Sequence, residues 1–152
     1  MISKSSASDV IIRHNEPITT RPMKTASNIA GALLGLLFLV FGLNFFLSFL
    51  PMPPDPSPAD APHKLFMSAL VPTGYFAFIK VIEITGALLV AIPKTRNFGL
   101  LLLGPIIVNI LAFHIFLLKG AALFQPPIVP VIVVLAAFLL WSGRRKFATL
   151  TN

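Results

Sequence analysis

The sequence predicts an all-α fold, a four-transmembrane-helix bundle with a short external amphipathic helix between helices 1 and 2. Two observations support this prediction. Hydrophobic residues make up 56% of the 152 residues and charged residues 11%, a composition with which a soluble domain would aggregate. Four apolar runs approach the ~20 residues that a helix needs to cross a bilayer. They are Ile29 to Leu50, Gly74 to Ile92, Phe98 to Leu118 and Pro127 to Trp141.

These runs define the domain organisation. Residues 28–147 form the predicted membrane domain, and residues 148–152 form a short C-terminal tail. Residues 1–27 are polar, rich in Ser and Thr, and lack an apolar core, so we expect a disordered cytoplasmic tail and neither a signal peptide nor a folded module.

Lysine and arginine residues predict the orientation of the bundle. Those on one side are Lys4, Arg13, Arg21, Lys24, Lys94, Arg96, Arg144, Arg145 and Lys146. The opposite side carries Lys64 and Lys119. The positive-inside rule therefore places both termini in the cytoplasm of a multi-pass protein of the plasma membrane, the inner membrane of a bacterium. The net charge of +7 reflects this orientation, and we expect no nucleic-acid partner.

The segment from Pro51 to Thr73 is external in this topology. Its PMPPDPSP opening excludes regular helix, because proline lacks an N–H donor and restricts the residue before it. Ser57 or Asp60 is then placed to cap a short amphipathic helix. The apolar positions of that helix are Leu65, Phe66, Ala69 and Leu70. Such a helix either floats among the headgroups as a linker or covers the bundle mouth as a lid.

Two charged residues interrupt the second apolar run. Lys80 and Glu83 are three residues apart, so about 60° of rotation and 4.5 Å of rise separate them on a helix, and they share a face. A charge near the middle of a membrane helix costs roughly 2.5–3.5 kcal/mol. We therefore expect the two side chains to meet on a face that points away from lipid.

Three further polar residues fall in the outer half or the midplane of the predicted bundle. Asn44 lies late in helix 1, and Asn109 and His114 lie in the middle and late parts of helix 3. Together with Lys80 and Glu83 they form a candidate polar cluster. Asn109 and His114 differ by about 140° around the helix, so one of them should face a neighbouring helix or another subunit.

The glycines of helix 1 offer a second contact face. Gly31 and Gly35 match the small-xxx-small pattern of closely packed membrane helices, and Asn44 projects to nearly the opposite side. The glycines pack either within the monomer or against a second copy of the chain.

Composition and motifs exclude several chemistries. The sequence has no cysteine, so it carries no disulfide, thiolate metal site or CxxC redox pair. It has no recognisable nucleophile arrangement, metal triad or phosphate-binding loop, and we expect no autonomous enzyme. The polar cluster is then a structural staple, a site for a ligand or for protons, or a contact with a partner protein.

Several short motifs follow one another in a distinctive order. FGLNFF closes helix 1, PMPP forms the next turn, KVIEITGALL lies in helix 2 and GPIIVNILAFHIFLL in helix 3. This order, over residues 28–147, resembles that of the DoxX family. The resemblance implies a four-helix membrane bundle. Named relatives include small subunits linked to quinol oxidation and to thiosulfate and quinone chemistry, although most members have no assigned activity.

Six residues of this sequence match positions in the motifs of the family. They are Lys80, Glu83, Gly86, Pro105, Asn109 and His114. Position 45 departs from the pattern, because Phe45 stands where the resemblance leads us to expect a basic residue. An anionic group that relatives hold at that position would be unbound here.

The leading hypothesis is a non-catalytic membrane protein of DoxX type that assists a quinone-linked or redox system. No cofactor ligand set is evident, and a quinone is the candidate ligand. Besides the lipid bilayer, the candidate partners are a membrane redox enzyme and a second copy of the chain. The alternatives are a small carrier or proton relay that uses Glu83 and His114, and a structural assembly subunit.

Overall fold

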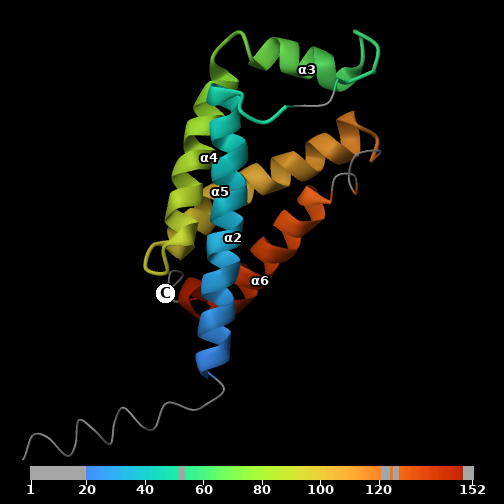
Figure 1. Ribbon diagram of the computed structural model, residues 1–152. Helices are drawn as coiled ribbons and strands as arrows, with labels where there is room; N and C mark the ends of the chain where they lie inside the picture. Colours follow the sequence, from blue (N-terminus) through green and yellow to red (C-terminus); the bar gives the residue numbers. More distant parts are fainter. Residues whose placement is uncertain (1–19, 52–53, 121–123, 125–126, 149–152) are drawn as a thin grey trace, which may run out of the picture.

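The computed structural model describes residues 20–51, 54–120, 124 and 127–148 of the chain, and the regular secondary structure among them is helical, with no strand (Figure 1). The helices are α2 (Thr20–Leu47), α3 (Pro62–Leu70), α4 (Tyr75–Ala91), α5 (Arg96–Ala112) and α6 (Ile128–Ala148). A π-helix, η1 (Phe113–Leu117), continues α5. The predicted all-α fold class is confirmed.

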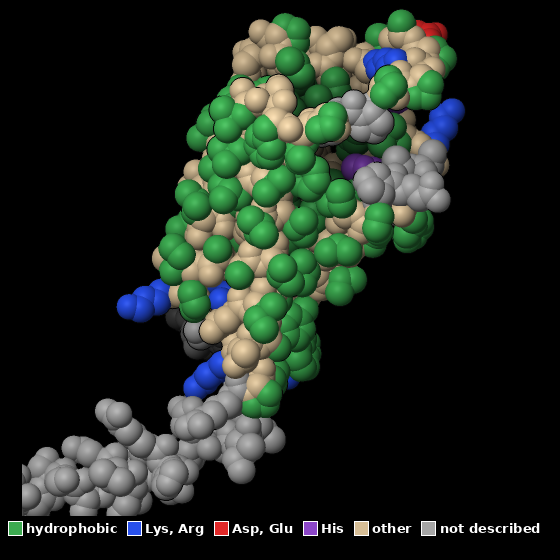
Figure 2. Space-filling view, viewed as in Figure 1, with side chains coloured by type: hydrophobic (Ala, Val, Ile, Leu, Met, Phe, Trp, Pro, Cys, Tyr) green, Lys and Arg blue, Asp and Glu red, His purple; other side chains and the backbone are tan. Residues whose placement is uncertain are grey.

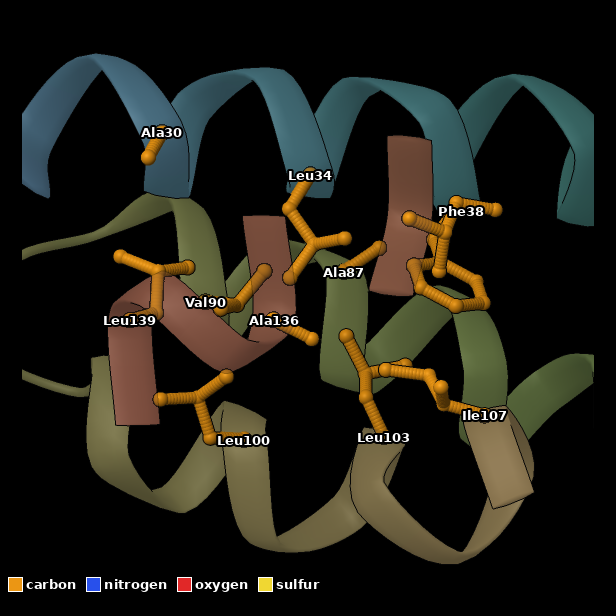
Figure 3. Packing of buried hydrophobic residues seen from close by; sticks show 11 residues of the cluster. Ala30, Leu34, Phe38, Ala87, Val90, Leu100, Leu103, Ile107, Ala136 and Leu139 are labelled. Carbon is orange, nitrogen blue, oxygen red and sulfur yellow. The ribbon is translucent and has the colours of Figure 1, made fainter. Parts of the chain in front are cut away.

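Four of these helices form a closed ring. α2 packs on α4, α4 on α5, α5 on α6, and α6 returns to α2. Their inward faces supply one apolar core (Figure 3). Its members are Ala30, Leu34, Phe38, Ala87, Val90, Leu100, Leu103, Ile107, Ile132, Ala136 and Leu139.

Glycines bring the backbones of α2 and α4 into close contact. A methyl group at Gly35 would lie 2.6 Å from the carbonyl oxygen of Ala87, and one at Gly31 would lie 2.9 Å from that of Val90. Gly99 approaches the backbone of Val90 in the same way from α5. The small-xxx-small glycines of helix 1 therefore pack within the chain.

Two helical segments are long and apolar enough to cross a membrane, Pro22–Leu47 and Arg96–Leu117. α3 and α4 meet this criterion as a pair but are bent by 87° relative to each other, and the apolar part of α6, Ile128–Arg144, is shorter. The described chain thus has two candidate spans, or three if the bent pair counts as one. Hydrophobic side chains cover the flank of the bundle in Figure 2, with lysine and arginine toward its two ends.

Helix boundaries differ from the sequence prediction at both ends of the bundle. α2 begins at Thr20, within the stretch predicted as a tail. Pro22 does not prevent this, because proline is tolerated in the first helical turn, where N–H groups have no intrahelical partner. α6 continues past Trp141 to Ala148. The rest of the predicted tails, residues 1–19 and 149–152, lies outside the described residues.

α3 lies at one end of the molecule, and the start of α2 and the end of α6 lie at the other (Figure 1). The short helix predicted after the prolines is present, but its predicted caps are wrong. Ala61 is the N-cap residue, without a side-chain hydrogen bond, and Pro62 follows in the first turn. Proline starts the helix here because its fixed φ suits the first turn and its missing N–H costs nothing there.

Candidate functional site

The expected contact between Lys80 and Glu83 is present inside the bundle. The Lys80 Nζ donates a hydrogen bond of 2.7 Å to Glu83 Oε2. The Glu83 side chain is 4% exposed and that of Lys80 is 16% exposed. Glu83 shares the inward face of α4 with Gly86, Ala87 and Val90. The pair is thus an ion pair sheltered by protein, as its cost in an apolar setting requires.

Aromatic rings surround the lysine end of this pair. The Lys80 ammonium lies 5.4 Å from the centroid of the Phe76 ring, a cation–π distance. Phe76 in turn meets Phe45 of α2 edge to face, with 5.3 Å between centroids. Phe45 therefore fills with apolar volume the position where the resemblance suggested a basic residue.

His114 lies on the π-helix that follows the C-terminal end of α5. Its Nδ1 is 2.8 Å from the carbonyl oxygen of Ile110. A carbonyl oxygen only accepts, so Nδ1 carries the proton in this bond. In the neutral ring Nε2 is then left as an acceptor. π-Helical turns inside longer helices are rare and recur at functional sites.

Asn44 stabilises the turn that follows α2. It is 5% exposed, and its Oδ1 accepts a hydrogen bond of 2.7 Å from the backbone N–H of Leu50. The chain turns between these residues through Ser48, which has a positive φ of 48°. The carboxamide of Asn44 thereby holds the segment after α2 against the end of that helix. A hollow of about 470 Å³ opens here, lined by Asn44, Phe45, Ser48, Leu50 and Pro51.

Asn109 does not join the other polar residues. It lies on the exposed side of α5, whereas Ile107 and Leu103 point into the core. The expectation that Asn109 and His114 cannot face one centre agrees with this arrangement. Lys80 and Glu83 touch each other, Asn44 and His114 bond to backbone, and Asn109 faces away from the bundle.

α3 lies at the end of the bundle opposite the start of α2 (Figure 1). In Figure 1 it extends from the start of α4 toward the end of α5, above the ends of both α2 and α5. Phe66 of α3 lies 5.9 Å from Phe113 of η1, centroid to centroid. This ring contact does not decide between the linker and the lid predicted for this helix, because no residue of α3 is buried.

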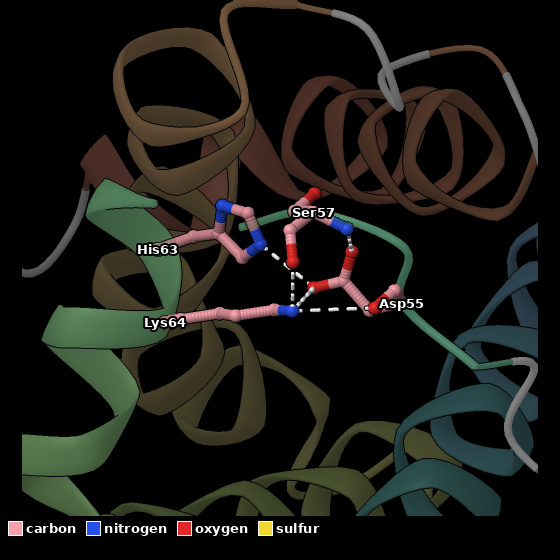
Figure 4. A network of polar contacts seen from close by, with 4 residues as sticks. All are labelled: Asp55, Ser57, His63 and Lys64. Carbon is pink, nitrogen blue, oxygen red and sulfur yellow. Dashed lines mark hydrogen bonds and ion pairs between the residues drawn. The ribbon is translucent and has the colours of Figure 1, made fainter. Parts of the chain in front are cut away.

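A polar network, formed by Asp55, Ser57, His63 and Lys64, connects the proline-rich segment to α3 (Figure 4). His63 Nε2 and Asp55 Oδ2 are 2.8 Å apart. Asp55 Oδ1 accepts a hydrogen bond of 2.9 Å from the Ser57 N–H, and Lys64 Nζ donates to the Ser57 carbonyl oxygen. The hydrogen bond with His63 is the largest of the effects that lower the pKa of Asp55.

Sequence reasoning missed this network because two of its members, Asp55 and Ser57, lie in a stretch where prolines suggested only a spacer. The spacing of eight residues between Asp55 and His63 indicates no contact until the chain direction is known. The hollow beside Asn44 was also missed, since it depends on a turn rather than on a motif. Among the described residues, no group of three or more His, Asp or Glu side chains could hold a metal ion.

Comparison with protein-family models, with curated proteins and with solved structures finds no match. The likeness to the DoxX family therefore rests on the quoted motifs alone.

Proposed function

We propose that the chain is a DoxX-type integral membrane protein that crosses the bilayer four times and assists a quinone-linked or redox system without catalysing a reaction itself. The polar groups in the outer half of the bundle orient either the head group of a quinone or a partner protein. Both termini lie in the cytoplasm, and in a bacterium the membrane is the inner membrane. The candidate partners are a membrane redox enzyme and a second copy of the chain.

The bend between α3 and α4 supports four crossings. At 87° to α4, α3 runs along the membrane surface if α4 stands upright. α4 has 17 residues, which at 1.5 Å per residue gives about 25 Å, close to the hydrocarbon thickness. α6 has 21 residues and returns the chain to the end at which α2 starts (Figure 1). The basic residues on either side of the predicted helices support the orientation.

The buried Lys80–Glu83 pair is the observation that best supports a ligand site. Its ammonium has three N–H donors and gives one of them to Glu83. The remaining donors can serve a neutral acceptor such as a quinone carbonyl oxygen. The Phe76 ring over the lysine and the neighbouring Phe45 give an apolar, aromatic lining of the kind that ligand pockets use.

His114 complements this donor with an acceptor. Because Nδ1 bonds to the Ile110 carbonyl oxygen, Nε2 of the neutral ring is left to accept a hydroxyl proton, as a quinol offers. α3 contacts the π-helix beside it through Phe66 and Phe113. An apolar ligand with one polar end suits this combination, with its tail directed toward lipid.

Extraction of the protein with its native lipids tests the ligand. The bound fraction is analysed for quinones by mass spectrometry, in the wild type and in Glu83→Gln. We expect quinone to copurify with the wild type and to be lost from the variant, because without the carboxylate the Lys80 ammonium is no longer held in place. Thr85→Val is the matched control, since Thr85 lies two residues away and is exposed. Absence of quinone from the wild type, or equal retention by Glu83→Gln, would refute this proposal.

A proton relay is the second candidate, and the fixed tautomer of His114 favours it. A histidine with Nδ1 bonded to backbone and Nε2 free can take up and release a proton at one defined atom. Proton flux into proteoliposomes should then fall in His114→Gln, whereas His63→Gln leaves it unchanged. Equal flux in wild type and His114→Gln rejects the relay. Copurification of a redox enzyme that persists in Lys80 and Glu83 variants would instead support an assembly subunit.

A further inference from the structure

Asn109 places a hydrogen-bonding amide on the outer surface of the bundle. The residue is exposed, and its side chain makes no hydrogen bond with any other described residue. It lies thirteen residues into the 22-residue candidate span Arg96–Leu117, far from either end. A carboxamide has two donors and two acceptor lone pairs. In hydrocarbon neither lipid tails nor water satisfy them, so a protein group must do so.

The surface around Asn109 is apolar and uncovered. Pro105, four positions earlier, lies about 40° from Asn109 around the helix, and Leu101, eight positions earlier, lies about 80° from it on the same side. Leu101 is 53% exposed, and Pro105 is exposed as well. The span that contains them is 17% buried within the chain, compared with 39% for the span in α2. α5 therefore offers a broad face on which a membrane partner could pack.

We propose that this face, Leu101, Pro105 and Asn109, is the contact between two copies of the chain in the membrane. A two-fold axis along the membrane normal brings the same residue of each copy to the same depth. The carboxamide is self-complementary, because each Asn109 can donate an N–H to the carbonyl oxygen of the other. A second copy thus supplies both missing partners with no further residue.

The proposed dimer face and the proposed ligand site use different residues in different places, so experiments can test them separately. Asn109 points away from the core that Ile107 and Leu103 enter, and Glu83 lies inside the bundle. The inference rests on the membrane placement proposed above but not on the quinone. The alternative occupant of the face is a different membrane protein.

Disulfide cross-linking of the full chain in native membranes tests the contact. Because the sequence has no cysteine, only the introduced residue can cross-link one copy of the chain to another. We expect Leu101→Cys to form a dimer on mild oxidation. Leu88→Cys on α4 is the matched control, because Leu88 is 52% exposed and Leu101 53%. Faster cross-linking at position 101 than at position 88 supports the proposal, and equal or slower cross-linking overturns it.

The amide is tested by substitutions at position 109. Single-molecule photobleaching in lipid bilayers measures the dimer fraction across protein-to-lipid ratios. We expect Asn109→Leu to raise the dissociation constant about ten-fold, the size of a polar contact between membrane helices, and Asn109→Gln to restore part of the affinity. An unchanged dissociation constant in Asn109→Leu, or a wild type that is monomeric throughout, refutes the proposal. So does photo-cross-linking from position 108 to a different protein.

Cysteine labelling distinguishes a wrong dimer proposal from a wrong membrane placement. If Asn109→Cys reacts with a membrane-impermeant maleimide, the residue is in water and the placement itself fails. If it is protected and no dimer forms, the dimer alone is wrong. Loss of quinone binding would leave both statements untouched.

Discussion

Removing one member of the Lys80–Glu83 pair should cost far more stability than removing both. Lys80→Met leaves a carboxylate that is 4% exposed without its ammonium, and breaking a buried pair in this way typically costs about 3–5 kcal/mol. Glu83→Leu leaves Lys80, which is 16% exposed, and its flexible stem lets the ammonium move outward toward water. We therefore expect Glu83→Leu to be the milder change, about 1–3 kcal/mol, the penalty for a buried donor left without its partner.

The double variant Lys80→Met/Glu83→Leu replaces both charges by apolar groups of similar volume. Such replacements are often neutral or stabilising by ~1–4 kcal/mol, so the free energy of unfolding should return to the wild-type value or exceed it. The coupling between the two sites then has a magnitude of several kcal/mol, well above the ~0.3–0.5 kcal/mol error of additivity for independent sites.

Reversible unfolding in detergent or bicelles, followed for all four proteins at the same pH, measures this cycle. Single variants that each cost less than about 1 kcal/mol would match the value of an exposed ion pair and would refute the burial of the pair. The same double variant also separates structure from function. If it folds as well as the wild type but carries no quinone, the pair serves the ligand and not the fold.

Three further predictions address other contacts. Gly35→Leu should destabilise the protein by about 1–3 kcal/mol in the same unfolding assay, because even its Cβ would lie 2.6 Å from a backbone carbonyl oxygen; a neutral result would show that α2 and α4 are not in backbone contact. Asn44→Leu should cost about 1–3 kcal/mol by leaving the Leu50 N–H without its acceptor, and hydrogen exchange at that amide should speed up, whereas Asn44→Asp keeps the acceptor. The pKa of Asp55 is lowered in the folded state, so its contribution to holding α3 is present at neutral pH and is lost only as pH falls below the ordinary aspartate range and through that lowered pKa. Protease sensitivity of the segment should rise there in the wild type, and Asp55→Asn should be sensitive at neutral pH; a wild type that is already sensitive near pH 4 would contradict this.

The apolar pattern was enough to predict the helices but not their ends. Long runs of Leu, Ile, Val and Phe identify membrane-length helices because the bilayer sets their length. Helix ends depend on local hydrogen bonds, and the polar stretch at Thr20 is helical although it carries no apolar signal. The capping residues at Ser57 and Asp60 were plausible by type, yet Ala61 and Pro62 start α3.

The polar site was predictable in part. The Lys80–Glu83 contact follows from a spacing of three on one helix, which needs no tertiary information. Grouping by depth alone placed Asn109 with them, and it failed because depth says nothing about which way a side chain points. The role of Asn44 depends on the backbone of Leu50, and a backbone contact leaves no trace in residue types.

The glycine contacts of α4 also determine where a molecule from the bilayer could enter the interior. α4 touches the backbone or core of α2 at Gly31 and Gly35 and that of α5 at Gly99, so neither seam leaves width for an acyl chain. α6 meets its neighbours through side chains such as Ile132 and Leu139, which can change rotamer. A lateral doorway for a hydrophobic guest would therefore open beside α6, and tethering that helix to α2 or α5 should close it.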